Sequence, residues 1–252
     1  MKVIVQNLAV SYSDEGAGPV VVLLHGWGVD AQNLASIKQA LTDRYRVISI
    51  DLPGFGASEI PKTAWRVRDY ARFVADLLVK LGVQELHALV GHSFGGRITL
   101  LGVGEAILRP QQVVLIGSAG IKHSDDIRNT IYRFVAKSGK MFFSLPGLRR
   151  FSGIARNRLY HTAGSTDYIN AGPMKAIFAH TIAEDLSEQA SRITCPALLI
   201  WGEYDQEAPV SDGERLHQLI KDSTLHILSG AGHFVHADAS AATNKLIREF
   251  LS

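Results

Sequence analysis

Short, mostly apolar runs recur along the chain, and they are continuous rather than alternating. The five clear runs are Val20–Leu24, Val47–Ile50, Leu86–Val90, Val113–Ile116 and Ala197–Trp201, and Leu225–Leu228 is a weaker sixth. Continuous runs of this length are typical of strands buried on both faces of a parallel sheet. Before them, Lys2–Val5 and Leu8–Tyr12 predict an antiparallel pair of strands that turns near Gln6 and Asn7.

Helix-length amphipathic stretches lie between the apolar runs. From Val67 to Leu81 the apolar residues follow helical spacing, and Gly82 supplies a stop signal. Two more helices are predicted over Gly96–Ile107 and Ala241–Leu251. The alternation of strands and helices predicts an α/β fold, with a mostly parallel sheet flanked by helices and right-handed crossovers between strands.

The alternation stops between Ser118 and about Ala190, where no clear strand run occurs. Helical patterns, glycines and aromatic residues are mixed there, and a strand-like run resumes at Ala197. We therefore predict a core of residues 1–117 and 191–252, with a mostly helical cap inserted at residues 118–190. The cap holds ten Lys and Arg against six Asp and Glu, so it carries +4 and the core carries −2.

The composition narrows the function before any motif is considered. The chain has 252 residues and a formal net charge of only +2, which argues against a dedicated nucleic-acid-binding protein. A single cysteine, Cys195, excludes an intramolecular disulfide and a cysteine-based zinc cluster. Because neither a signal-peptide pattern nor an apolar run near ~20 residues is present, we expect a cytoplasmic protein without membrane insertion.

One motif carries the chemistry. Gly91-His92-Ser93-Phe94-Gly95 matches the pattern G-x-S-x-G, with a predicted strand before it and a predicted helix after it. In that setting a serine lies on a sharp strand-to-helix turn, and glycines two residues to either side remove side chains that would clash. The Ser93 hydroxyl is therefore expected at the carboxyl edge of the sheet as a nucleophile.

A serine hydroxyl needs a base to take its proton and an acid to orient that base. Asp205 follows the predicted strand Ala197–Trp201, and His233 follows the last strand, so both fall at the same sheet edge as Ser93. The rival acids are Asp212 and Asp238, which fit less well because of their places in the sequence. His236 is the rival base.

Further site residues follow if the activated serine attacks an acyl group. The oxyanion of an acyl transfer needs N–H donors, which we predict to be those of Phe94 and Trp27. We assign substrate binding to Phe142, Phe143 and His25, although cap packing for the two phenylalanines and loop hydrogen bonding for His25 are competing interpretations. The spacing of His233 and His236 resembles that of two metal ligands. Since no third ligand lies at a suitable spacing, no metal site is predicted.

At this point the chain resembles the α/β-hydrolase superfamily, in a serine carboxylesterase-like branch with a helical cap. The resemblance covers nearly the whole chain and is carried by five motifs in the family's order. They are His25-Gly26-Trp27-Gly28, Asp51-Leu52-Pro53-Gly54-Phe55-Gly56-Ala57-Ser58, the Ser93 turn, the Asp205 loop and Gly232-His233. The resemblance implies the order Ser, Asp, His for the catalytic residues.

These patterns predict a serine hydrolase that cleaves small to medium carboxylic esters through an acyl-serine intermediate. No cofactor is required, and the partner is a small-molecule ester; the protein is expected to be a monomer or a homodimer. Two alternatives remain. One is a carbon–carbon bond hydrolase for ring-cleavage products, although such enzymes commonly carry Asn where this chain has His92. The other is a small-molecule receptor of the same fold with little turnover.

Overall fold

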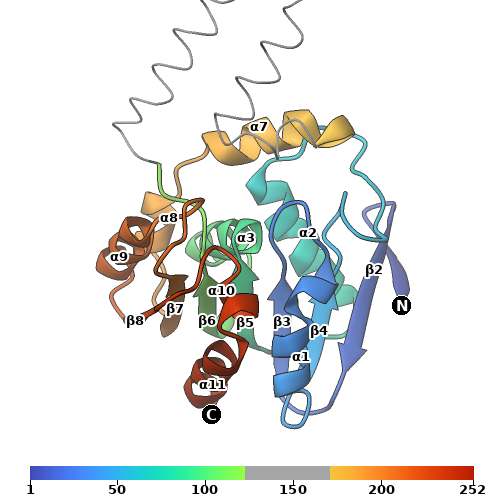
Figure 1. The fold of residues 1–252 in the computed structure, drawn as a ribbon. Coiled ribbons are helices and arrows are strands. Elements are labelled where there is room, and N and C mark those ends of the chain that lie inside the picture. The colour runs from blue at the N-terminus through green and yellow to red at the C-terminus, as the bar shows by residue number, and fades with distance from the viewer. Residues whose placement is uncertain (123–170) are drawn as a thin grey trace, which may run out of the picture.

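The structure, a computed structural model, describes residues 1–122 and 171–252. Eight strands form one sheet in the order β1-β2-β4-β3-β5-β6-β7-β8 (Figure 1). Their bounds are β1 Lys2–Val5, β2 Leu8–Glu15, β3 Val20–Leu24, β4 Arg46–Ile50, β5 Leu86–His92, β6 Pro110–Ile116, β7 Ala197–Gly202 and β8 Ser223–Leu228. The predicted α/β fold with a mostly parallel sheet is confirmed.

The first two strands are the antiparallel part of the sheet. β1 pairs with β2, β2 pairs antiparallel with β4, and every pair from β4 to β8 is parallel. Gln6 and Asn7 both have positive φ, 49° and 61°, as a tight hairpin with two left-handed central residues requires. The predicted turn is confirmed.

Helices cover both faces of the sheet (Figure 1). On one face lie α2, α3, α8 and α9, and on the other lie α1, α10 and α11. The helix bounds are η1 Ala31–Leu34, α1 Ala35–Leu41, α2 Val67–Lys80, α3 Phe94–Gly104, η3 Gly172–Met174, α7 Lys175–Ala183, α8 Ser187–Ser191, α9 Val210–Leu219, α10 Val235–Asp238 and α11 Ser240–Leu251. The three helices expected from the sequence correspond to α2, α3 and α11.

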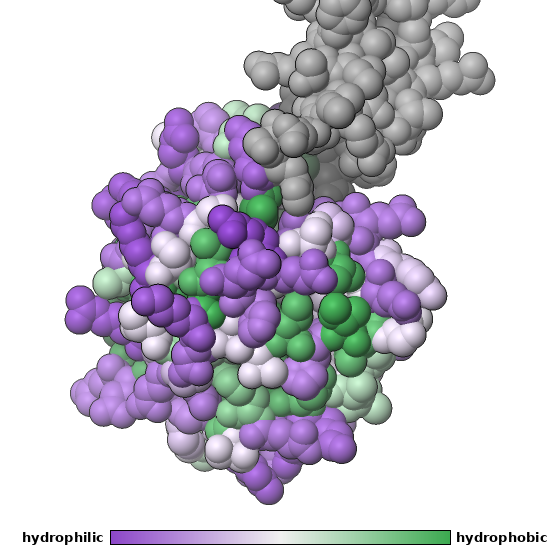
Figure 2. All heavy atoms as spheres, turned by 90° about the vertical axis from the view of Figure 1, so that its left-hand side faces the viewer, coloured by the Kyte–Doolittle hydropathy of each residue, from purple (hydrophilic) through white to green (hydrophobic). Residues whose placement is uncertain are grey.

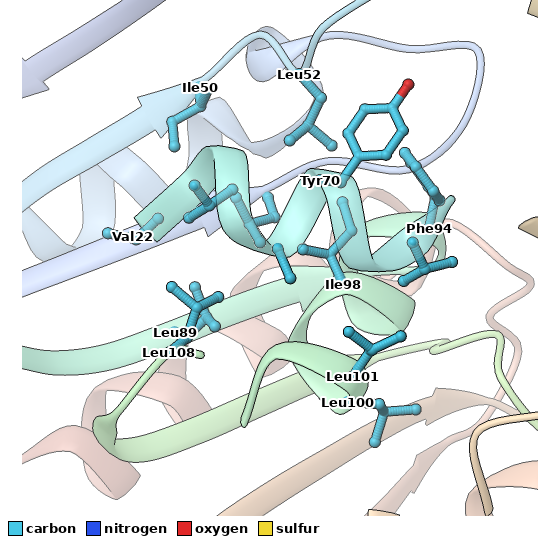
Figure 3. Packing of buried hydrophobic residues seen from close by; sticks show 14 of the residues in the cluster. Val22, Ile50, Leu52, Tyr70, Leu89, Phe94, Ile98, Leu100, Leu101 and Leu108 are labelled. Atoms are coloured by element: carbon cyan, nitrogen blue, oxygen red, sulfur yellow. The ribbon is translucent and has the colours of Figure 1, made fainter. Parts of the chain in front are cut away.

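The sheet has a hydrophobic core on each face, which explains why its strands are continuously apolar. In β3, Val22 and Leu24 pack into the core beneath α2 and α3, whereas Val21 and Leu23 pack into the core beneath α1 and α11. Figure 3 shows the first core, where side chains from the sheet meet those of α2 and α3. Adjacent residues point to opposite sides of a strand, so burial on both faces makes every position apolar.

Residues 171–190 belong to the predicted cap and are helical where they are described. α7 lies above the sheet edge where the parallel strands end (Figure 1). The buried Arg97 of α3 joins this segment to the core, because its Nη1 donates to the carbonyl oxygens of Thr181 at 2.8 Å and Glu184 at 3.0 Å. Burial lowers the pKa of Arg97 to about 10. The extent of the cap, and its charge, remain predictions.

The surface beside α8 and α9 intermixes hydrophilic and hydrophobic residues (Figure 2). None of the helices over residues 1–122 and 171–252 is both long enough and apolar enough to cross a bilayer.

Candidate active site

Ser93 lies at the junction of β5 and α3, where the chain reverses sharply. Its backbone angles are φ 49° and ψ −106°, which a non-glycine residue adopts only under strain. The turn is packed tightly against the central strands: a Cβ on Gly91 would lie 2.5 Å from the carbonyl oxygen of Gly95. The two flanking glycines are therefore required by space, as the motif predicted.

We expect Gly95→Ala to destabilise the fold strongly. The new methyl group would lie 2.1 Å from the carbonyl oxygen of Leu24, which belongs to a central strand that cannot move aside. Overpacking of this kind typically costs about 1–3 kcal/mol and occasionally more. Thermal unfolding measures the loss. Gly232→Ala is the matched control, because there the nearest atom is 3.5 Å away, and an equal loss in both variants would contradict the argument.

Three of the predicted residues form one hydrogen-bonded series. The Ser93 hydroxyl donates to Nε2 of His233 at 2.9 Å. Nδ1–H of His233 donates to Asp205, 2.9 Å from Oδ2 and 3.0 Å from Oδ1. Both side chains are buried, at 7% exposure for His233 and 0% for Asp205. This geometry allows the histidine to take a proton from the serine while the carboxylate stabilises the resulting imidazolium.

The loop after β7 fixes the carboxylate of this series. Oδ1 of Asp205 accepts hydrogen bonds from the backbone N–H groups of Glu207 and Ala208 at 3.0 and 2.9 Å. Of the rival acids, Asp212 lies in α9, and Asp238 accepts from the N–H of Gly232. The structure therefore places Asp205 against the base.

Two further histidines lie behind His233. Nε2–H of His92 donates to the carbonyl oxygen of His233 at 3.1 Å, and Nε2–H of His236 donates to Oδ1 of Asn33 at 2.9 Å. Their rings pack edge to face, with centroids 4.5 Å apart. His92 thus holds the loop that carries His233, whereas His236, the rival base in the sequence analysis, is bound to Asn33.

Both of these histidines are neutral at pH 7. Burial, followed by the neighbouring charges of His236 and His233, holds the pKa of His92 far below its usual value. Burial, followed by the charge of His233, lowers the pKa of His236 to about 4. Nδ1 of each ring is buried and has no hydrogen-bond partner within residues 1–122 and 171–252. An unprotonated nitrogen tolerates that position, whereas a protonated one does not.

We expect His236 to make the fold sensitive to acid. Because its pKa is about 4 when folded and near 6.5 when unfolded, the unfolded chain takes up the proton first. The contribution of neutral His236 to the free energy of unfolding is complete above pH 6.5. It is lost as pH falls toward 4, by up to about 1.4 kcal/mol per pH unit. Urea unfolding of His236→Gln from pH 7 to 4.5 should show a shallower decline than wild type. His217→Gln, in exposed α9 surface, should not, and parallel wild-type and His236→Gln profiles would refute the assignment.

The two predicted oxyanion donors lie on neighbouring loops. Trp27 follows β3, and Phe94 is the first residue of α3, whose initial N–H groups have no partner within the helix. In the described part of the chain, no atom accepts a hydrogen bond from the N–H of Trp27 or Phe94. Gly95, by contrast, donates its N–H to the carbonyl oxygen of His25. Within residues 1–122 and 171–252, both N–H groups are thus without an acceptor, as the predicted role of oxyanion donor requires.

The remaining predicted site residues are His25, Phe142 and Phe143, and the structure describes only the first of them. His25 is fully buried, its Nδ1–H donates to the carbonyl oxygen of Gly26, and its Nε2 accepts the N–H of Leu52. Since the backbone uses both ring nitrogens, substrate binding by His25 does not fit, and its role is to hold two loops together. Phe142 and Phe143 lie outside the described residues.

An aromatic cluster beside Trp27 was not assigned from the sequence. The Trp27 ring packs edge to face against Phe55 at 4.9 Å, Phe94 at 5.3 Å and Phe178 of α7 at 4.9 Å between centroids. Tyr70 of α2 packs edge to face against Phe94, and Figure 3 shows the Tyr70 ring between Leu52 and Phe94. Phe178 is the member of this cluster that comes from residues 118–190, and it brings α7 against the loop that carries Trp27.

Within residues 1–122 and 171–252, no group of three or more His, Cys, Asp or Glu side chains is arranged to hold a metal ion. The candidate site is therefore described by the hydrogen-bonded series, with the N–H groups of Trp27 and Phe94 as predicted oxyanion donors. A nucleophile turn at the carboxyl edge of a parallel sheet, with an acid and a histidine on the last two strand loops, defines a hydrolase of the α/β class. The chain belongs to the family described as the alpha/beta hydrolase fold, whose sequence profile matches residues 19–240.

Two relatives that are named as hydrolases match this chain over nearly its whole length. It is 31% identical to the uncharacterized hydrolase YugF of Bacillus subtilis, covering 92% of this chain and 89% of that one. It is 30% identical to the 2-hydroxy-6-oxononadienedioate/2-hydroxy-6-oxononatrienedioate hydrolase of Burkholderia vietnamiensis, covering 97% and 91%. Among solved structures, a bacterial membrane phospholipase A has a TM-score of 0.77 at 26% identity, covering 100% and 84%.

Proposed function

We propose that this hydrolase cleaves carboxylic esters of small to medium acyl groups through an acyl intermediate on Ser93. The observation that carries the proposal is the hydrogen-bonded series from Ser93 through His233 to the buried Asp205, with 2.9 Å between Oγ and Nε2. Such a series activates a serine hydroxyl, which is a weak nucleophile on its own. The similar phospholipase A structure supports ester cleavage, since its name is that of an ester-cleaving enzyme.

The reaction uses each group in turn. Ser93 Oγ attacks the ester carbonyl while Nε2 of His233 takes its proton, and Asp205 stabilises the imidazolium. The carbonyl oxygen becomes an oxyanion that accepts hydrogen bonds from the N–H groups of Trp27 and Phe94. The C–O bond to the alcohol then breaks, and His233 gives its proton to the departing oxygen. Water repeats the sequence on the acyl-serine and releases the acid.

A second candidate is carbon–carbon bond hydrolysis of ring-cleavage products. It is supported by the name of the Burkholderia vietnamiensis relative, which matches 97% of this chain. The same series of residues serves both reactions, so the substrate separates them. A third candidate, a receptor of this fold, is separated by turnover, because a receptor releases product once or not at all.

A substrate panel tests the proposal. Wild-type protein is incubated with p-nitrophenyl esters of rising acyl length and with a ring-cleavage dienoate, and the products are followed over many turnovers. We expect multiple-turnover release of p-nitrophenol and, after rapid acid quenching, an acyl adduct on the peptide that contains Ser93. Activity on the dienoate alone would replace ester hydrolysis by carbon–carbon bond hydrolysis. Release limited to one equivalent would favour a receptor.

A further inference from the structure

A second carboxylate lies on the open side of His233. Oε2 of Glu207 is 3.4 Å from Nε2 of His233, the same nitrogen that accepts the Ser93 hydroxyl at 2.9 Å. The two carboxylates around this imidazole differ in surroundings: the Asp205 side chain is 0% exposed, whereas that of Glu207 is 62% exposed. Asp205 therefore contacts the ring at Nδ1 from a buried position, and Glu207 approaches Nε2 from a solvent-exposed one.

The backbone at Glu207 is held in place by the site itself. Its N–H donates to Oδ1 of Asp205 at 3.0 Å, and the next N–H, of Ala208, donates to the same oxygen at 2.9 Å. The loop that fixes the buried acid thus also fixes the position from which the Glu207 side chain extends. A nearby carboxylate of this loop, that of Glu203, is instead bound to Ser229 and Gly230.

The chemistry of Nε2 sets how close Glu207 comes to a substrate. In the proposed reaction Nε2–H of His233 donates to the departing alcohol oxygen, at an ordinary hydrogen-bond distance of about 2.8 Å. Because Glu207 Oε2 lies 3.4 Å from the same nitrogen, the carboxylate and the departing oxygen are no more than about 6 Å apart. A charge carried close to the departing oxygen therefore interacts measurably with the carboxylate, even through water.

We propose that Glu207 is a specificity-determining residue, whose carboxylate disfavours anionic leaving groups and favours cationic ones. The inference rests on the proposed ester hydrolysis and adds to it a charge preference at the leaving-group side. Since the carboxylate is largely exposed, screening by water and salt limits the preference to about three- to tenfold at low ionic strength. A substrate with a carboxylate beside the cleaved bond is therefore a poorer one than its neutral analogue.

Three phenyl acetates test this preference. They are 3-carboxyphenyl acetate, phenyl acetate and 3-(trimethylammonio)phenyl acetate, which release anionic, neutral and cationic phenols. For each ester, kcat/KM of Glu207→Gln is divided by that of wild type at 20 mM salt, so that differences in leaving-group reactivity cancel. We expect the ratio to rise about three- to tenfold for the anionic ester, to stay within twofold for the neutral one, and to fall correspondingly for the cationic one.

Matched conditions separate a local charge from other effects. Glu214→Gln removes the same charge from exposed surface on α9 and should leave all three ratios near one. At 0.5 M NaCl the preferences should shrink toward one, because the screening length falls to a few ångströms. Equal ratios for the three esters would overturn the proposal, as would the same graded pattern in Glu214→Gln.

A covalent reaction at Ser93 separates failure of this inference from failure of ester hydrolysis. A diethyl phosphate triester of 4-nitrophenol and a diethyl phosphorothiolate of thiocholine add the same diethylphosphoryl group to the serine oxygen, with cleavage of the P–O or P–S bond to the leaving group, and mass spectrometry detects the adduct. Glu207→Gln should slow only the reaction that releases cationic thiocholine. Equal slowing of both triesters overturns the charge preference and leaves the nucleophile intact. If neither compound labels Ser93, the assignment of Ser93 as the nucleophile is contradicted, and the charge preference that rests on it is contradicted as well.

Discussion

Ser93→Ala should abolish turnover of the best ester in the panel, with kcat reduced by about 10⁴- to 10⁶-fold. The substitution removes the oxygen on which the proposed acyl intermediate forms, together with the hydroxyl proton that Nε2 of His233 would take. The N–H groups of Trp27 and Phe94 remain, so any residual rate comes from oxyanion stabilisation and substrate binding. Initial rates are measured with stoichiometric protein, so that slow turnover is distinguished from none.

Ser118→Ala is the matched control for this variant. Ser118 lies directly after β6 and is fully buried, and its hydroxyl donates to the carbonyl oxygen of Ala119 rather than to the histidine. Its loss should change kcat by less than tenfold. If Ser93→Ala kept the wild-type rate while its thermal unfolding matched that of wild type, the hydrolysis would have to use another nucleophile.

Asp205→Asn should lower kcat by about 10⁴-fold without unfolding the protein. The amide oxygen can still accept the N–H groups of Glu207 and Ala208, so the loop keeps its shape. The amide NH₂ then faces Nδ1 of His233 and donates to it, which forces the ring proton onto Nε2. A ring in that tautomer cannot take the proton of Ser93. We expect kcat at every pH measured, and the rate at which a phosphate triester labels Ser93, to fall together.

The two rival carboxyls provide the controls for this prediction. Asp212→Asn and Asp238→Asn should each retain kcat within about tenfold, because neither carboxyl is the one that lies against Nδ1 of His233. A loss in Asp212→Asn that matched the loss in Asp205→Asn, in a protein of unchanged stability, would transfer the role of acid.

The strands of this fold were predictable because their burial is read directly from the sequence. Val20–Leu24 was located to the residue, since all five of its residues are apolar and both of its faces are covered. The sharp turn at Ser93 was also predictable, because only glycines fit at positions 91 and 95. Asp205 was found from its place after β7, since the ends of parallel strands meet at one sheet edge.

Other parts of the site depend on contacts between distant segments, which leave no periodic signal. A histidine in the place of His25 could bind a substrate. Only the fold shows that the backbone of Gly26 and of Leu52 occupies its two ring nitrogens. Phe178 is one of many aromatic residues in 118–190, and its contact with Trp27 follows from the path of the chain back to the core. Glu207 reads as an ordinary surface acid until β8 brings His233 beside it.

Arg97 has a consequence for how this protein can change over evolution. It binds α7 through the main-chain oxygens of Thr181 and Glu184, and every amino acid carries such an oxygen. Substitutions at those two positions therefore leave the attachment in place, provided that the segment keeps its path. The sequence around α7 can therefore diversify while its attachment to α3 is kept. That attachment depends on Arg97 and on the path of the main chain, not on the side chains at positions 181 and 184.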